Sequence, residues 1–241
     1  LKTATSNATT GFNNEGTISV AGGTTTSGIA GMNVSYGTIN NGTSAGSSAS
    51  VTIDNGAGLY GTNGSKLVNN GKITVASGAG IAGIGTGRTK QEYGTDVKTS
   101  ASLGGTKTVE IENHGTINAA GTGSIAIYAE NNTNAPKANV TVSSDKQLTV
   151  GTDGVGIAVI STTPTPMLVN HGTSDEGGTI TVTASGTGSD IKTGVNGKGI
   201  YAQNSDITLT GNYIIETPEK GIGIFASKNT NVTGTLEYKY N

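Results

Sequence analysis

Residues Asn69–Ala82 read Asn-Asn-Gly-Lys-Ile-Thr-Val-Ala-Ser-Gly-Ala-Gly-Ile-Ala, and this stretch contains the signals that decide the fold. An Asn-x-Gly corner leads into a short strand in which apolar and polar residues alternate, and the stretch closes on Gly-x-Gly-Ile. A period of two places the aliphatic side chains on one face of a strand. Gly adopts positive φ freely and Asn bonds its own backbone, so both favour the turn. The stretch predicts a strand-and-turn unit with one apolar face.

The same unit recurs along the 241 residues. The corner copies are Asn14-Glu15-Gly16, Asn40-Asn41-Gly42, Asn69-Asn70-Gly71, Asn113-His114-Gly115 and Asn170-His171-Gly172. The closing motif places an aliphatic residue at Ile29, Leu59, Ile81, Ile127, Ile157, Ile200 and Ile224. Successive differences between these seven numbers are 30, 22, 46, 30, 43 and 24. The short values predict a unit of about 22–30 residues, within the range of known repeats. The two long values are either two coils, one of them degenerate, or one coil with a long insertion.

A single unit cannot bury its apolar face, whereas stacked units bury a continuous core. The sequence therefore predicts an all-β fold, a right-handed parallel β-helix (a single-stranded β-solenoid) with loop insertions, over residues 1–241. Eight to ten coils, about 4.8 Å apart, would form a rod of roughly 40–45 Å. We expect the corner asparagines to bond one another as a ladder. We expect these isoleucines to point inward: Ile18, Ile29, Ile53, Ile73, Ile81, Ile117, Ile127, Ile157, Ile180, Ile200 and Ile224.

Composition narrows the function classes. The net charge is only -2 and Arg88 is the single arginine, which argues against a nucleic-acid partner. Cysteine is absent, so the chain has no disulfide or thiolate metal site. Aromatic residues are 4% of the chain, so we expect aromatic sugar-binding sites to be scarce.

Insertions between coils are the expected place for recognition, because loops on a rigid scaffold carry function. We expect insertions near residues 85–106, 131–137, 161–166 and 186–198. The longest supplies a candidate partner-binding loop made of Arg88, Lys90, Glu92, Tyr93, Asp96 and Lys98.

The search for catalytic chemistry yields no candidate, and we predict no enzyme activity, no cofactor and no metal site. His114 and His171 occupy the same repeat position, where Glu15, Asn41 and Asn70 stand in other copies, so we interpret it as an exposed, variable corner position. The calcium-binding repeat Gly-Gly-x-Gly-x-Asp does not occur. Polysaccharide lyases with a β-helix fold need clustered basic and acidic residues, and this sequence has few such clusters. A pair of acids that acts as in glycosidases is an alternative that the sequence leaves open.

Coils that read Asn-Asn-Gly-Lys-Ile-Thr-Val and then Gly-x-Gly-Ile-x-Ala resemble the passenger domains of type Va autotransporters, most of all the large fusobacterial outer-membrane adhesins. The resemblance covers nearly the whole chain, but it rests on a repeat and transfers no functional residue. It implies type V secretion, display at the bacterial cell surface, and anchoring at the outer membrane by a C-terminal β-barrel beyond this segment. It also implies a monomer that attaches to a protein or glycan on host cells or other bacteria.

Three functions therefore remain open. The first is an adhesin segment that binds through an insertion loop. The second is a structural stalk that presents a binding tip located elsewhere in the parent chain. The third is a polysaccharide-degrading β-helix enzyme.

Overall fold

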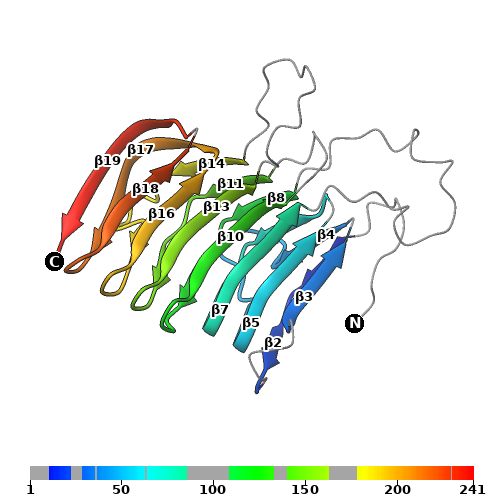
Figure 1. Cartoon of the computed structure of the whole chain (residues 1–241). Coiled ribbons are helices and arrows are strands. Elements are labelled where there is room, and N and C mark those ends of the chain that lie inside the picture. The colour runs from blue at the N-terminus through cyan, green and yellow to red at the C-terminus, as the bar shows by residue number, and fades with distance from the viewer. Residues whose placement is uncertain are drawn as a thin grey trace, which may run out of the picture.

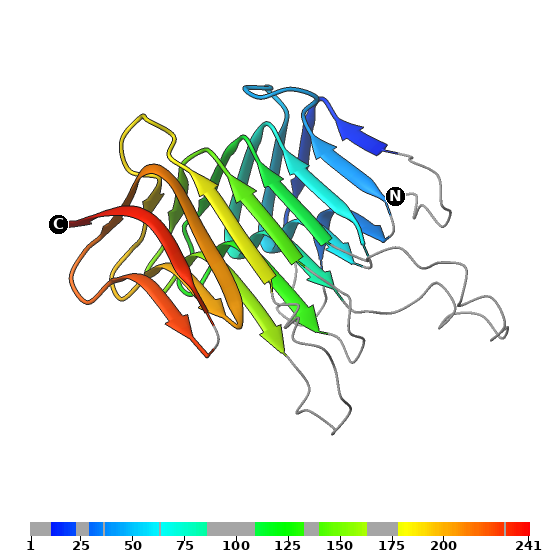
Figure 2. The same ribbon diagram turned by 90° about the horizontal axis from the view of Figure 1, so that it is seen from above.

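The computed structural model is all-β and describes residues 11–22, 29–35, 37–62, 64–85, 109–132, 140–162, 178–228 and 230–241. Its strands pair in parallel and form three faces that run the length of the stack (Figures 1 and 2). Face A contains β1 (Gly11–Asn14), β4 (Thr38–Asn41), β6 (Lys66–Asn69), β8 (Val109–Asn113), β11 (Val140–Ser144), β14 (Gly178–Thr183) and the first parts of β17 (Ser205–Thr217) and β19 (Val232–Tyr240). Face B contains β2 (Thr17–Val20), the first parts of β5 (Ser50–Thr62) and β7 (Lys72–Gly85), then β9 (Thr116–Ala119), β12 (Leu148–Val150), β15 (Ile191–Lys192) and the second parts of β17 and β19. Face C contains β3 (Ala30–Ser35), the second parts of β5 and β7, then β10 (Ile125–Asn132), β13 (Val155–Thr162), β16 (Lys198–Gln203) and β18 (Ile222–Ser227).

The chain passes through faces A, B and C in turn and advances by one coil each time. In Figure 1 the strands of face C lie in front with their arrowheads at the top, and the chain returns behind them as it advances leftward to the C-terminus. A path that rises in front and descends behind while it moves to the left is right-handed. Within the described residues there are seven such coils, and β19 begins an eighth. The predicted parallel β-helix is confirmed, and the described residues form seven complete coils and part of an eighth, fewer than the eight to ten expected.

The core includes three rows of large aliphatic side chains, one behind each face, stacked in register, and further buried residues such as Ile53, Val75 and Val159 pack beside them. The rows are Ile39–Leu67–Ile111–Val142–Ile180–Ile207 behind face A, Val51–Ile73–Ile117–Leu148–Ile191–Ile215 behind face B, and Met32–Leu59–Ile81–Ile127–Ile157–Ile200 behind face C. Every one of these side chains is at most 2% exposed. Because burying a side chain of this size contributes about 1.5–3 kcal/mol, these rows are the main source of stability.

Eight of the eleven isoleucines expected inside are buried to 1% exposure or less. Ile18 and Ile224 lie in the first and seventh coils, where they are partly buried against the core. Ile29 is a wrong assignment, because Met32 is the residue that pairs with Leu59 in the core row. Gly28-Ile29-Ala30 imitates the closing motif, but the strand starts at Ala30 and the true copy is Gly31-Met32.

The predicted asparagine ladder is confirmed at the corner between faces A and B. The Nδ2 of Asn14, Asn41 and Asn69 each donates to the Oδ1 of the next asparagine, the last being Asn113, over 2.8 Å in every case. Asn113 then donates to Oγ of Ser144 at 3.1 Å. The coil-2 member is Asn41, which is 0% exposed. The expectation that Asn41 occupies an exposed, variable position is therefore wrong, and the corner motif of that coil begins one residue later than the sequence indicated.

The corner glycines have a different role from the one expected. Gly71 and Gly115 do not adopt positive φ. A Cβ at Gly115 would instead lie 2.0 Å from the carbonyl oxygen of Gly71, and one at Gly71 would lie 2.1 Å from that of Ala49. Glycine is required here because neighbouring coils approach closely. Gly42, which directly follows the ladder residue Asn41, does adopt positive φ, at 85°.

The two long repeat spacings are each one coil with an insertion. Ile81 pairs directly with Ile127, and Ile157 pairs directly with Ile200. Much of 186–198 is a regular part of the coil, because it includes β15, which pairs with β12 and β17. The extra length lies in the turn before β15, where residues 184–190 take the place of the shorter connection 145–147 in the preceding coil. His171 and Asn170 lie outside the described residues, and in that coil the position in register with Ser144 is Val182.

Candidate binding face

Three consecutive coils are interrupted at the same place, the edge where face C passes into face A. Strand β7 ends at Gly85, opposite Asn131 of β10, which in turn lies opposite Ser161 of β13. The chain returns in β8, β11 and β14, which also pair with one another. Because paired strands lie about 4.8 Å apart, the three departures and the three returns are close neighbours. We call this edge, with its strand ends β7, β10 and β13, the insertion edge.

The segments that leave the insertion edge are residues 86–108, 133–139 and 163–177. In the next coil a single residue, Asn204, joins β16 to β17 across the same edge. The six residues predicted as a partner-binding loop, Arg88, Lys90, Glu92, Tyr93, Asp96 and Lys98, all belong to 86–108 and lie outside the described residues. Their attachment points are the C-terminus of β7 and the N-terminus of β8.

The outer surface of face C is unusually apolar and aromatic. One row, in register from coil 2 to coil 7, reads Tyr60–Ala82–Tyr128–Ala158–Tyr201–Phe225. The row one step further along the strands, nearer the insertion edge, reads Thr62–Ile84–Glu130–Ile160–Gln203–Ser227. The first row contains four of the ten aromatic residues of the chain, which has eight Tyr and two Phe. A low overall aromatic content is thus compatible with a local concentration of aromatic rings.

The tyrosines of this row are held by their neighbours along the strand. Tyr128 donates from its hydroxyl to Oε2 of Glu130 at 2.6 Å, and Tyr201 donates to Oε1 of Gln203 at 3.3 Å. Partial burial, followed by the hydrogen bond and the charge of Glu130, raises the pKa of Tyr128 well above its ordinary value. The rings of Tyr201 and Phe225 stack in parallel, with centroids 5.3 Å apart and 4° between their planes. These contacts fix the orientation of the rings of Tyr128, Tyr201 and Phe225 on the outer surface.

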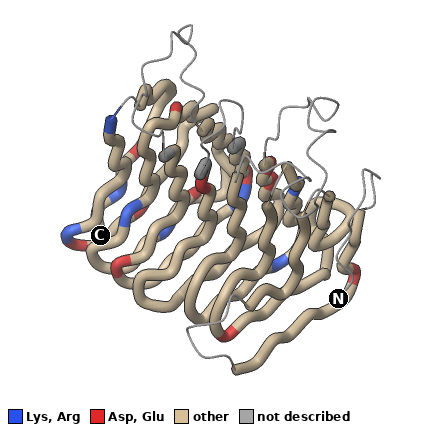
Figure 3. The backbone as a smooth tube through the Cα atoms, turned by 45° about the vertical axis from the view of Figure 1, so that its right-hand side comes forward, with Lys and Arg blue, Asp and Glu red and all other residues tan. Residues whose placement is uncertain are grey.

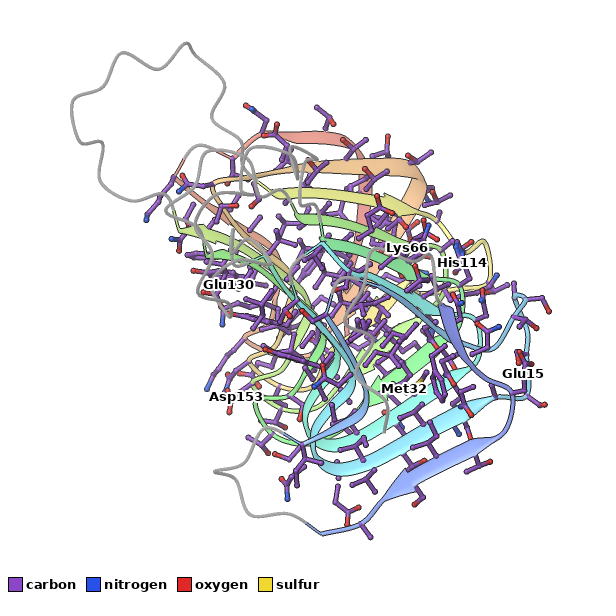
Figure 4. All side chains as sticks on the ribbon, turned by 90° about the vertical axis from the view of Figure 1, so that its right-hand side faces the viewer. Glu15, Met32, Lys66, His114, Glu130 and Asp153 are labelled. Carbon is purple, nitrogen blue, oxygen red and sulfur yellow. The ribbon has the colours of Figure 1, made fainter. Side chains whose placement is uncertain are left out.

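Faces A and B carry a different chemistry on their outer surfaces. On face A, Lys66 contacts Glu112 at 2.6 Å and Glu110 at 3.6 Å. The hydrogen bond to Glu112 is the main reason why the pKa of Lys66 is raised, and burial opposes it. Outer face B has Thr, Ser, Asn and Lys along β5, β7 and β9. Charged residues are spread along the coils in Figure 3, and Figure 4 places Glu130 on a different side of the coils from Lys66 and His114.

Two corners hold polar networks that support the fold. His114 Nδ1 lies 3.1 Å from Oδ2 of Asp145 on the next coil, and both side chains are more than a third exposed. Asp190, 2% exposed, accepts hydrogen bonds from the backbone N–H of Ser185 at 2.6 Å and of Ile214 at 2.7 Å. Oδ1 of Asp190 thus fixes the turn within its own coil, and Oδ2 joins this coil to the next one. Across the described residues, no three His, Asp or Glu side chains are grouped so that they could hold a metal ion.

Sequence reasoning missed the aromatic row, although its signal was present. Each closing motif places one residue directly after the aliphatic residue, and in this position stand Tyr60, Tyr128, Tyr201 and Phe225. A period of two sends that residue to the outer surface whenever the aliphatic residue points inward.

The geometry defines the molecule as a parallel β-helix with one aromatic face beside an interrupted edge. No protein-family model, no curated protein and no solved structure matches the chain. In the part of the chain that the structure describes, no helix is long and apolar enough to cross a membrane.

Proposed function

We propose that this chain is a segment of an exported bacterial surface adhesin, in which the β-helix is a rigid scaffold for attachment to host cells or other bacteria. The observation that carries the proposal is the insertion edge. Three consecutive coils leave the helix at one edge, and the same edge borders face C, whose outer surface carries the row of Tyr, Ala and Phe residues. Loops on a rigid scaffold and exposed apolar surface are both typical of recognition sites.

The resemblance to autotransporter passenger domains supports the same proposal. Passengers of this kind are secreted and displayed at the bacterial surface, so the expected location is extracellular, at the outer membrane. The small net charge of -2 suits a protein or neutral glycan partner better than a nucleic acid.

The proposal is tested by shortening the three connections at the insertion edge. Residues 86–108, 133–139 and 163–177 are each replaced by Asn-Gly-Ser, the sequence that joins β5 to β6 in this chain. A matched control shortens residues 42–49, at the corner between faces A and B, to Asn-Gly, the connection of the next coil. Attachment of the labelled proteins to epithelial cells and to bacteria is measured by flow cytometry.

We expect the edge-shortened variant to lose attachment and the control to keep it, with both variants retaining β-sheet circular dichroism. If the edge-shortened variant attaches as well as the unaltered chain, binding does not depend on the insertion edge. If the unaltered chain attaches to no cell, the stalk function replaces the adhesin function. Release of sugar products from a polysaccharide panel by the unaltered chain would favour the enzyme instead.

A further inference from the structure

From coil 2 to coil 6 the outer surface of face C repeats every two coils, and coil 7 then adds Phe225 directly beside Tyr201. Tyr60, Tyr128 and Tyr201 lie in coils 2, 4 and 6, and Ala82 and Ala158 lie in register between them. The two alanines are only 7% and 3% exposed although they point outward. Their burial means that neighbouring side chains cover them, so the alanines leave no gaps in the surface between the tyrosines.

The polar groups on this face follow the same two-coil period. Two residues after each tyrosine stands a hydrogen-bonding side chain, namely Thr62, Glu130 or Gln203. Two residues after each alanine stands an isoleucine, Ile84 or Ile160. From coil 2 to coil 6, coils with a ring and a polar group therefore alternate with coils whose outward side chains in these two rows are aliphatic.

The repeat distance of this alternation along the helix axis is one that a ligand can match. Two coils span about 10 Å along the axis, from the spacing of paired strands. A β-1,4-linked pyranose chain is an extended ribbon in which neighbouring rings are turned over, so every second ring presents the same face after a similar distance. Aromatic rings with a nearby polar group suit the apolar face and the hydroxyls of such a sugar.

The small number of charged residues on face C indicates whether a glycan that binds there is neutral or charged. Among the described outer positions of face C, the charged residues are Glu130 and Lys198, one of each sign. A surface with so little charge neither attracts a polyanion such as a uronate polymer nor supplies the basic groups that a nucleic acid needs. A neutral chain loses no ionic solvation when it lies on this face.

We propose that face C binds a linear, neutral β-1,4-linked glycan that runs along the helix axis, with alternate sugars against Tyr60, Tyr128 and Tyr201. Glu130 and Gln203 accept hydrogen bonds from its hydroxyls, and Ile84 and Ile160 pack against the sugars between. This inference deepens the proposed adhesin function and rests on it, because it names the class of surface molecule that the scaffold would hold.

The test uses the whole chain and three triple variants. The first replaces Tyr60, Tyr128 and Tyr201 by alanine, and the second replaces them by phenylalanine, which keeps the rings. The third, a control on outer face B, is Thr52→Ala, Thr74→Ala and Asn118→Ala. Titration calorimetry measures binding of cellohexaose and chitohexaose, with the α-linked maltohexaose as a comparison, and circular dichroism confirms that each variant is folded.

We expect the unaltered chain, the phenylalanine variant and the face B control to bind a β-1,4-linked hexamer more tightly than maltohexaose. The alanine variant should bind at least about tenfold more weakly, as truncation of anchoring aromatics does. The inference is overturned if the unaltered chain binds neither β-linked hexamer, if the alanine variant binds as well as the unaltered chain, or if the phenylalanine variant loses binding.

Cell attachment by the same proteins separates this inference from the adhesin proposal. Attachment that the alanine variant retains in full leaves the adhesin proposal standing and overturns face C as the binding surface. Attachment that depends on the tyrosines, with no binding to either hexamer, indicates a protein partner and overturns the inference that face C binds a glycan. Hexamer binding through the tyrosines without attachment to any cell overturns the adhesin proposal alone.

Discussion

Asn69 donates a hydrogen bond from Nδ2 to Oδ1 of Asn113 over 2.8 Å, although 44 residues separate them in the chain, and neither side chain is exposed to solvent. The bond spans an entire coil together with an insertion. It therefore reports that coils 3 and 4 lie directly on one another, whatever the length of chain between them.

Replacement of Asn69 by alanine should lower the free energy of unfolding by about 2–3 kcal/mol. The substitution removes the bond that Asn69 accepts from Asn41 and the bond that it donates to Asn113, and it leaves buried polar groups without partners. Urea denaturation followed by circular dichroism measures the change. Asn40→Ala is the control, because Asn40 bonds Asn13 on the exposed surface; a loss there as large as at Asn69 would contradict a special role for the buried ladder.

Replacement of Gly115 by alanine should destabilise the protein by about 1–3 kcal/mol, the usual cost of overpacking. The new Cβ would lie 2.0 Å from the carbonyl oxygen of Gly71, so one coil must move away from the other. Gly16→Ala provides a matched control, since Gly16 holds the same corner position in the first coil and a Cβ there meets nothing within 4 Å. Thermal melting of both variants should show a clear shift for Gly115→Ala alone, and equal shifts would refute the close-approach argument.

Replacement of Asp190 by asparagine should cost about 1–3 kcal/mol. Both oxygens of the buried carboxylate accept backbone N–H groups, and an amide nitrogen in place of one oxygen would face the N–H of Ser185 or of Ile214. Asp54→Asn is the comparison, because Asp54 accepts from the N–H of Gly22 at an exposed site. Chemical denaturation that shows no larger loss for Asp190→Asn would argue against the role of this carboxylate in joining coils.

Glu216 should make stability depend on pH in the acid range. The hydrogen bond from Ser189, followed by the charge and hydrogen bond of Lys192, lowers the pKa of Glu216 below its ordinary value of 4.5, against the opposing effect of burial. A lowered pKa in the folded state means that the contribution is present above pH 4.5 and is lost as pH falls through the folded value. Glu216→Gln should therefore flatten the fall of melting temperature on acidification. The exposed Glu219, changed to glutamine, should leave the curve as it is; an unchanged curve for Glu216→Gln would refute the prediction.

Much of this fold could be predicted from the sequence, because its determinants are local and repeated. Alternation such as Val51-Thr52-Ile53 sends every second residue inward whatever happens elsewhere in the chain. The register within a coil was less secure, since Asn40 and Asn41 are chemically identical neighbours and Ile29 imitates the closing motif. Pairing with the next coil, of Asn41 with Asn69 and of Met32 with Leu59, decides between such candidates.

The sequence by itself determined a stack of parallel coils with an aliphatic interior and an asparagine ladder, because each coil carries the same short pattern and cannot bury it alone. Only the tertiary structure decided that each long repeat spacing is one coil with an insertion and not two coils. Tyr60, Tyr128 and Tyr201 therefore lie on one face, two coils apart from one another. The distances between these tyrosines along the chain, 68 and 73 residues by their numbers, contain insertions that add length without adding a coil. Strand pairing places each coil directly on the previous one, however many residues an insertion adds. It therefore determines which side chains share a surface.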